Sequence, residues 1–363
     1  MKSIEEEKQN VVDWLMHPSE LGCKPKKIEF TMEFTDDDGI HCMIFKYKKT
    51  LFSPWLLAIS SESGVFSEMQ EYDPKTEVED AKKIIEFLKE HWKRVAAEED
   101  ERRERNENAH AFTAFVLLKE PVWEPEVFES SFSNDWGIDL SQEAEDEDGE
   151  NASEDGEESG SDARIYDVGT MRLVLGYMDF KVPNEEAEYW AQFNYMWKEA
   201  VEITKTHKAQ ILVTVMGEGT LKEKGVLYAK AVAALCRQEN VIGVYANDIV
   251  YEPKFLVAMS EMMENGGFPL FNLVWIGLGR TENGTSAYTC GMNSLGKDEI
   301  EIVDSKQKPS ELREFLMNIV DYVISDDVIL RDGETIGMTN EQRLKIVKSE
   351  GVNVKGDSLK ILY

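Results

Sequence analysis

Few residues of this chain have the types and spacing that metal binding or acid–base chemistry requires. The five histidines are scattered singly, at positions His17, His41, His91, His110 and His207. A zinc site would need a histidine pair at helical spacing, or a local cluster with cysteine and acidic residues. The sequence therefore predicts no metal and no cofactor.

Motifs for a catalytic nucleophile are also missing. The chain has no G-x-S-x-G elbow, and its four cysteines lie far apart without a CxxC pair. That pattern is typical of reduced, buried thiols. Residues 217–219, Gly-Glu-Gly, lack the remaining positions of a phosphate-binding loop. We expect no catalytic residue, although an enzyme of unknown class stays open if His207, Cys236 or paired carboxylates meet in a cleft.

The candidates for binding are aromatic residues and one polar loop. In the expected helix 185–206, Tyr189 and Tyr195 lie off the apolar face, where they would suit a protein partner or pack on the next helix. The loop after the strand 241–245 places polar groups at the end of a buried strand, where functional residues often gather. The predicted binding residues are Tyr189, Tyr195, Tyr245, Asn247, Asp248 and Tyr251.

The chain is strongly acidic, with a net charge of −31 over 363 residues. Residues 141–163 hold eleven carboxylates and no basic residue, and like charges at this density predict a disordered, solvated insertion. A passive spacer explains this run as well as a functional role does. The acidity predicts a basic protein partner and excludes nucleic acid and membrane surfaces.

The distribution of apolar residues restricts where in the cell the protein is expected. The first residues are charged and do not resemble a signal peptide, and no stretch reaches the roughly 18 apolar residues of a membrane span. We therefore expect a cytoplasmic protein. The oligomeric state is not determined by the sequence.

Hydrophobic periodicity predicts an α+β fold in two domains. Residues 1–106 are expected to form a small N-terminal antiparallel sheet, with strands from residue 27 on, followed by the long connector helix 76–106. Residues 107–363 show the order β-α-β-β-α-β of a ferredoxin-like split-βαβ sandwich. A similar order in 111–217 and 221–350 suggests that the sandwich is duplicated.

Short motifs across residues 111–350 resemble the bacterial family catalogued as domain of unknown function 4261 (DUF4261). They include LVWIGLGRTENGTSAYTCGMNSLGKDEIEI and DGETIGMTNEQRLKI. The resemblance implies no activity and no catalytic residues, because none is assigned to the family. It places relatives near bacterial toxin and immunity systems.

These observations favour a non-enzymatic, cytosolic protein-binding module, such as an immunity-type inhibitor whose acidic surface steers it onto a basic partner. The alternative is a small-molecule-sensing domain, with a pocket between the two α+β halves around Tyr245 and Asn247. A defined pocket with convergent polar groups would favour this alternative.

Overall fold

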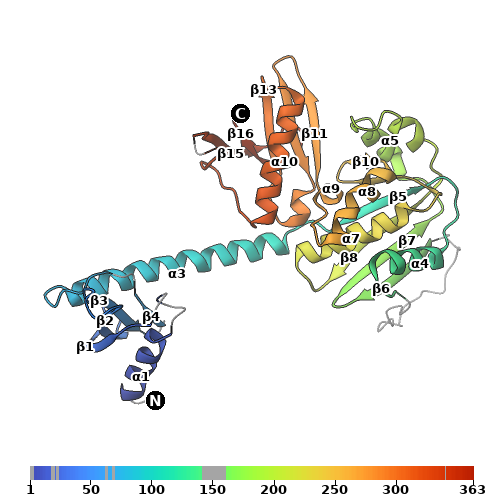
Figure 1. Cartoon of the computed structure of the whole chain (residues 1–363). Helices are drawn as coiled ribbons and strands as arrows, with labels where there is room; N and C mark the ends of the chain where they lie inside the picture. The colour runs from blue at the N-terminus through green and yellow to red at the C-terminus, as the bar shows by residue number, and fades with distance from the viewer. Residues whose placement is uncertain are drawn as a thin grey trace. The chain divides into compact units, whose positions relative to one another are not determined.

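The computed structural model describes residues 4–17, 21, 24–61, 64–67, 70–140, 161–339 and 341–363. It divides into two compact units, Met1–Glu101 and Arg102–Tyr363, and each has the mixed α+β composition expected from the sequence (Figure 1). Residues 141–160 of the expected acidic insertion lie outside the described residues. Within the described ranges, no helix is both long and apolar enough to cross a membrane.

The first unit is a four-stranded antiparallel sheet between two helices. Its strands pair in the order β1-β2-β3-β4, and each hydrophobic face of the sheet packs on one helix. Residues Met43, Phe45 and Tyr47 pack against α1, whereas Cys42 and Ile44 pack against the start of α3. This follows from the two-residue alternation of strands. The elements are α1 (Ile4–Leu15), β1 (Lys27–Thr35), β2 (His41–Lys48), β3 (Leu56–Ser61), β4 (Gly64–Phe66) and α3 (Glu77–Glu107).

The second unit contains two six-stranded sheets. The strands of the first sheet are β5 (Thr113–Leu118), β6 (Ser161–Val168), β7 (Met171–Met178), β8 (Ala209–Gly217), β9 (Val241–Ala246) and β10 (Ile249–Tyr251). They pair in the order β10-β9-β5-β8-β7-β6. Helices α4 (Pro125–Trp136) and α7 (Leu221–Cys236) pack on one face, and α5 (Glu186–Ala191) and α6 (Ala200–Thr204) on the other. Alternate residues of β5 supply the two faces, so this sheet is covered on both sides.

The second sheet has the order β11-β12-β13-β16-β15-β14, and its β13–β16 pair is parallel. Its strands are β11 (Trp275–Arg280), β12 (Thr285–Cys290), β13 (Ile300–Ser305), β14 (Thr335–Ile336), β15 (Leu344–Glu350) and β16 (Asp357–Ile361). Helix α10 (Pro309–Ser325) packs along β11 and β12. One continuous hydrophobic core joins the two sheets and fixes their relative position. The shorter elements are η1 (Pro183–Glu185), α8 (Pro253–Ser260), η2 (Glu261–Asn265), α9 (Leu270–Leu273) and η3 (Met292–Leu295).

The ferredoxin-like arrangement expected from the element order is not confirmed. A split-βαβ unit requires parallel strands on either side of its helix, but β5 and β6, which flank α4, run antiparallel with β8 and β7 between them. The two sheets also differ in strand order. Strand pairing therefore departs from the order in which the elements follow one another in the chain.

The helix expected over residues 185–206 is broken into α5 and α6, and Asn194 explains the break. Its side-chain Oδ1 accepts hydrogen bonds from the N–H groups of Met196 (2.9 Å) and Trp197 (3.1 Å). Its Nδ2 donates to the Val250 carbonyl at 2.8 Å. Asparagine competes with the helix for backbone groups in this way. The resulting turn places Tyr195 next to the second sheet.

Replacing Asn194 with alanine should destabilise the second unit by about 2 kcal/mol, because buried backbone donors and an acceptor lose their partner. Urea unfolding of N194A measures this change. The control is N318A, since Asn318 makes a single exposed hydrogen bond on α10. Equal stabilities of the two variants would contradict this role of Asn194.

Candidate functional site

A cavity of about 350 Å³ lies between the two sheets of the second unit. Its walls come from β5, β9 and the α5 region on one side, and from β11, β12 and the loop 351–356 on the other. Six aromatic side chains line it: Phe115, Trp190, Phe193, Tyr245, Trp275 and Tyr288. Asparagine, carboxylate and lysine side chains reach the same space, so the cavity combines flat apolar walls with polar groups.

The β9–β10 hairpin supplies polar residues at the centre of the cavity. Its two-residue loop is Asn247-Asp248, and both residues have positive φ (52° and 55°), as a type I′ turn requires. The Asn247 Nδ2 donates to the Leu273 carbonyl at 2.9 Å. The Asp248 Oδ2 lies 3.3 Å from the Lys355 Nζ, which also lies over the Trp190 ring at 5.6 Å. The hairpin thus joins both sheets at the cavity.

The second sheet can contribute to this wall because two positions are glycine. A Cβ on Gly277 would lie 2.2 Å from the Tyr288 ring, so glycine lets that ring lie flat across β11. Gly291 has φ +112°, and a Cβ there would lie 2.2 Å from the Leu273 carbonyl and 2.8 Å from Asn247 Nδ2. Both glycines permit a close approach that any other side chain would block.

Glu299 is a buried carboxylate at the cavity wall. Its Oε1 accepts hydrogen bonds from the Gly291 N–H at 2.9 Å and the Asn293 N–H at 3.4 Å, and its Oε2 accepts one from the Thr289 hydroxyl at 2.5 Å. Burial raises the pKa of Glu299 above its usual value despite these donors. The carboxylate organises the turn after β12, and through Gly291 it fixes the backbone next to Asn247.

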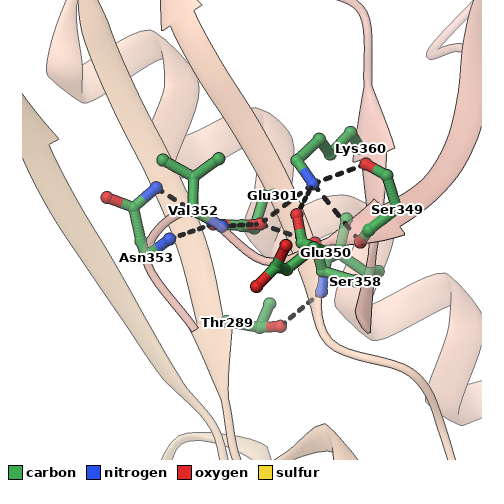
Figure 2. Close-up of polar contacts among 9 residues, drawn as sticks. Thr289, Glu301, Ser349, Glu350, Val352, Asn353, Ser358 and Lys360 are labelled. Carbon is green, nitrogen blue, oxygen red and sulfur yellow. Dashed lines mark hydrogen bonds and ion pairs between the residues drawn. The ribbon is translucent and has the colours of Figure 1, made fainter. Parts of the chain in front are cut away.

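Glu301, the second residue of β13, holds the loop 351–356 (Figure 2). It accepts hydrogen bonds from the backbone N–H groups of Val352 (3.0 Å) and Asn353 (2.7 Å), and from the Ser358 hydroxyl (2.5 Å). Burial by itself would raise the pKa of Glu301. The hydrogen bonds to the carboxylate have the larger combined effect, so this pKa is lowered. Because this loop carries Val354 and Lys355 into the cavity wall, Glu301 positions that wall from outside the cavity.

The structure brings three of the six predicted binding residues into this cavity: Tyr245, Asn247 and Asp248. Of the other three, Tyr251 is 1% exposed within the core, and Tyr195 donates from its hydroxyl to the Ile276 carbonyl at 2.8 Å. Tyr189 is 56% exposed and packs edge-on against Trp190.

Sequence reasoning missed the residues that the second sheet contributes, namely Trp275, Tyr288, Glu299 and Lys355. The available signal was the two-residue alternation of side chains along β11 and β12, which indicated which of their residues share one face of the sheet. Nothing in the sequence showed that this face lies opposite Tyr245.

His110 lines the cavity together with Cys290 and Glu299. The other two residues considered for chemistry, His207 and Cys236, do not lie in it. His207 is fully buried: its Nε2 accepts from the Val182 N–H at 3.1 Å, so the imidazole is neutral and its Nδ1–H donates to the Thr204 carbonyl at 2.6 Å. Cys236 lies on α7 beside a different groove. Among the described residues, no group of three or more histidine, cysteine or acidic side chains is arranged to hold a metal ion.

Comparison with protein families gives a match for the C-terminal part of the chain. Residues 288–362 match the model of a protein family described as a domain of unknown function, DUF4261. This confirms the family suspected from the sequence motifs, over a shorter stretch than residues 111–350. The matched segment includes Tyr288, Glu299, Glu301 and Lys355, which form or support one wall of the cavity. No curated protein and no solved structure matches the chain.

Replacing Glu301 with alanine should lower the free energy of unfolding by about 3 kcal/mol, since the buried Ser358 hydroxyl and two part-buried loop amides lose a charged acceptor. Hydrogen exchange of the Val352 and Asn353 amides should accelerate more than exchange elsewhere in the sheet. E350A is the matched control, because the Glu350 side chain on the same sheet is exposed. Unchanged protection of both amides in E301A would contradict the role of Glu301.

The stability of the second unit should fall as the pH drops below 6.5, in part because of His207. Burial is the main cause that lowers the pKa of His207 from its ordinary value of 6.5, so the unfolded chain binds a proton there before the folded chain does. This contribution is complete above pH 6.5 and is lost below it, by up to about 1.4 kcal/mol per pH unit. Urea unfolding should show a shallower pH slope for H207Q between pH 6.5 and 5. An equally steep slope would contradict this account.

Proposed function

We propose that this protein, whose residues 288–362 match the DUF4261 family, binds a small organic ligand in the cavity between the two sheets of Arg102–Tyr363, and so acts as a small-molecule-sensing domain. The observation that carries the proposal is the cavity itself, in which six aromatic side chains and several polar groups converge. Ligand sites in proteins have this character, with mostly apolar walls and a few placed polar groups.

The walls indicate what kind of ligand would fit. A volume of about 350 Å³ is at the lower end of the range for ligand pockets, so the ligand is a small metabolite rather than a dinucleotide. Stacked Phe115 and Tyr245 rings, 6.0 Å apart, offer flat apolar contact. The Asp248–Lys355 pair presents both signs of charge at one edge. These features favour a planar ligand with a polar or zwitterionic edge.

The state of Cys290 favours binding over thiol catalysis. This cysteine lines the cavity as a free thiol. Burial, and next the nearby negative charge of Glu299, raise the pKa of Cys290 well above its ordinary value. Since the thiolate is the reactive form, a thiol that stays protonated is a poor nucleophile. A function without covalent catalysis is therefore the simpler proposal.

The immunity-type function, in which the acidic chain binds a basic protein, stays a prediction. It rests on the net charge of −31, which favours cationic partners but does not indicate which surface of the protein would bind them. The exposed Tyr189 beside the cavity would be an aromatic anchor for such a partner. A cytoplasmic location also stays part of the proposal, supported by the free thiols of Cys236 and Cys290.

Filling the cavity should abolish ligand binding. The substitution Val354→Trp places a large ring in the cavity wall, whereas Val352→Trp changes a 62% exposed position of the same loop that does not line the cavity. A thermal-shift screen of planar amino acids, nucleobases and related metabolites on the wild-type chain identifies ligands. A ligand at a hundred times its Kd stabilises the protein by about 2.7 kcal/mol.

A ligand found in this way should stabilise V352W but not V354W. Two outcomes would contradict it: no member of the screen stabilises the wild type, or a ligand stabilises both variants equally.

A further inference from the structure

The loop between β2 and β3 of the first unit presents two apolar side chains to solvent. Leu51 is 66% exposed and Phe52 is 98% exposed. They occupy the middle of a turn closed by its two ends: the Thr50 N–H donates to Ser53 Oγ at 3.1 Å, and the Ser53 N–H donates to Thr50 Oγ1 at 3.1 Å. The Ser53 hydroxyl also donates to the Thr50 carbonyl at 3.0 Å. The apolar tip is thus held in place by its own hydrogen bonds.

This exposure contributes nothing to folding of the first unit. A single exposed leucine is common on protein surfaces, but an adjacent leucine and phenylalanine on a fixed turn gain no burial within the unit. The turn type does not require them either, because polar residues suit these central positions better. The tip therefore has the properties of a contact site for an apolar environment outside the molecule.

Lysines gather around Trp55, which follows this loop in the chain. The ammonium groups of Lys46, Lys48 and Lys27 lie over the Trp55 ring, at 4.8, 5.2 and 5.6 Å from its centroid. Lys27 is opposite Lys48 across the β1–β2 pair, and the backbone N–H of Lys26 donates to the Lys48 carbonyl. We name these residues, Lys26, Lys27, Lys46, Lys48 and Trp55, the lysine–tryptophan patch.

The charge of this patch is only partly balanced. Glu29 lies 3.3 Å from Lys27 and 3.1 Å from Lys46. Like charges placed opposite one another on neighbouring strands destabilise a sheet. The lysine–tryptophan patch is therefore a concentration of positive charge in a chain that is otherwise strongly acidic.

We propose that the first unit docks on an anionic lipid surface, with Leu51 and Phe52 entering the acyl boundary and the lysine–tryptophan patch contacting the headgroups. An apolar tip backed by lysine and tryptophan matches the layers of a membrane interface. Each lysine near an anionic surface adds to the attraction, which falls off within a Debye length of about 8–10 Å. The patch thus acts locally despite the net charge of −31.

A lipid surface fits this site better than a nucleic acid does. Bases stack on aromatic rings, but the face of Trp55 is covered by lysines of the chain itself. Leu51 has no ring to offer a base, whereas a bilayer accepts leucine and phenylalanine equally. The inference is independent of the ligand cavity, which lies in the other unit.

Flotation of the full chain with vesicles tests the proposal, with phosphatidylcholine vesicles compared with vesicles that also contain phosphatidylglycerol. Binding should require phosphatidylglycerol and weaken as salt is raised. The double substitution Leu51→Ser with Phe52→Ser should reduce binding by ~10-fold or more, because it removes the apolar contact. Lys26→Gln with Lys48→Gln should reduce it by a similar factor.

Matched controls separate docking from general effects. Phe180→Ser removes an aromatic side chain that is 51% exposed in the other unit, and Lys75→Gln with Lys93→Gln removes two exposed lysines of the first unit. Both should bind vesicles as the wild type does. Circular dichroism melting checks that every variant folds.

Three results would overturn the proposal. The first is that the wild type fails to float with anionic vesicles. The second is that it floats equally well with neutral vesicles. The third is that the tip variant and the control variants bind vesicles alike. A different result would assign the site to nucleic acid instead: vesicles do not bind, but a single-stranded oligonucleotide binds the wild type and loses affinity in both the tip variant and the lysine variant.

Discussion

The structure around the cavity depends on how two buried carboxylates are satisfied. Glu299 immediately precedes β13 and Glu301 lies near its start, and each takes its hydrogen bonds largely from backbone N–H groups of a neighbouring loop. A buried carboxylate without donors would cost several kcal/mol, so these loops are held to the sheet. One loop carries Gly291 to Asn247, and the other carries Lys355 to Asp248. The hydrogen bonds of these two carboxylates thus position the loops at both edges of the cavity.

The remaining walls follow from which faces of the sheets are covered. The first sheet is covered on both sides, and the second is covered by α10 along β11 and β12. Because Asn194 ends α5 early, the chain turns and places Tyr195 against Trp275 instead of continuing as a helix. The space that stays open is bordered by rings from α5, β5, β9, β11 and β12. An aromatic cavity results where the two sheets meet.

Local signals predicted much of this architecture. The alternation of residues 27–34, the apolar stripe of 76–97 and the turn residues all led to elements that the structure contains. Asn247 and Asp248 were also recognisable, because polar residues after a buried strand commonly form a functional loop. The order of the strands within each sheet was not recognisable, and the expected split-βαβ order is not confirmed, because strand order is set by pairing between distant segments. Trp275 and Tyr288 were missed for the same reason.

The sequence by itself determined the α+β composition, the acidity and the positions of most helices and strands, because periodicity and charge act over a few neighbouring residues. It also indicated that Asn247 and Asp248 would lie in a loop after a buried strand, although not that this loop is the turn of the β9–β10 hairpin. Only the tertiary structure decided that this turn faces Tyr288 and Lys355, which are 40 and 107 residues away from Asp248 in the chain. That meeting depends on packing of one core across two sheets and on the buried carboxylate of Glu301, whose backbone donors lie 51 and 52 residues away in the chain. No local pattern encodes either.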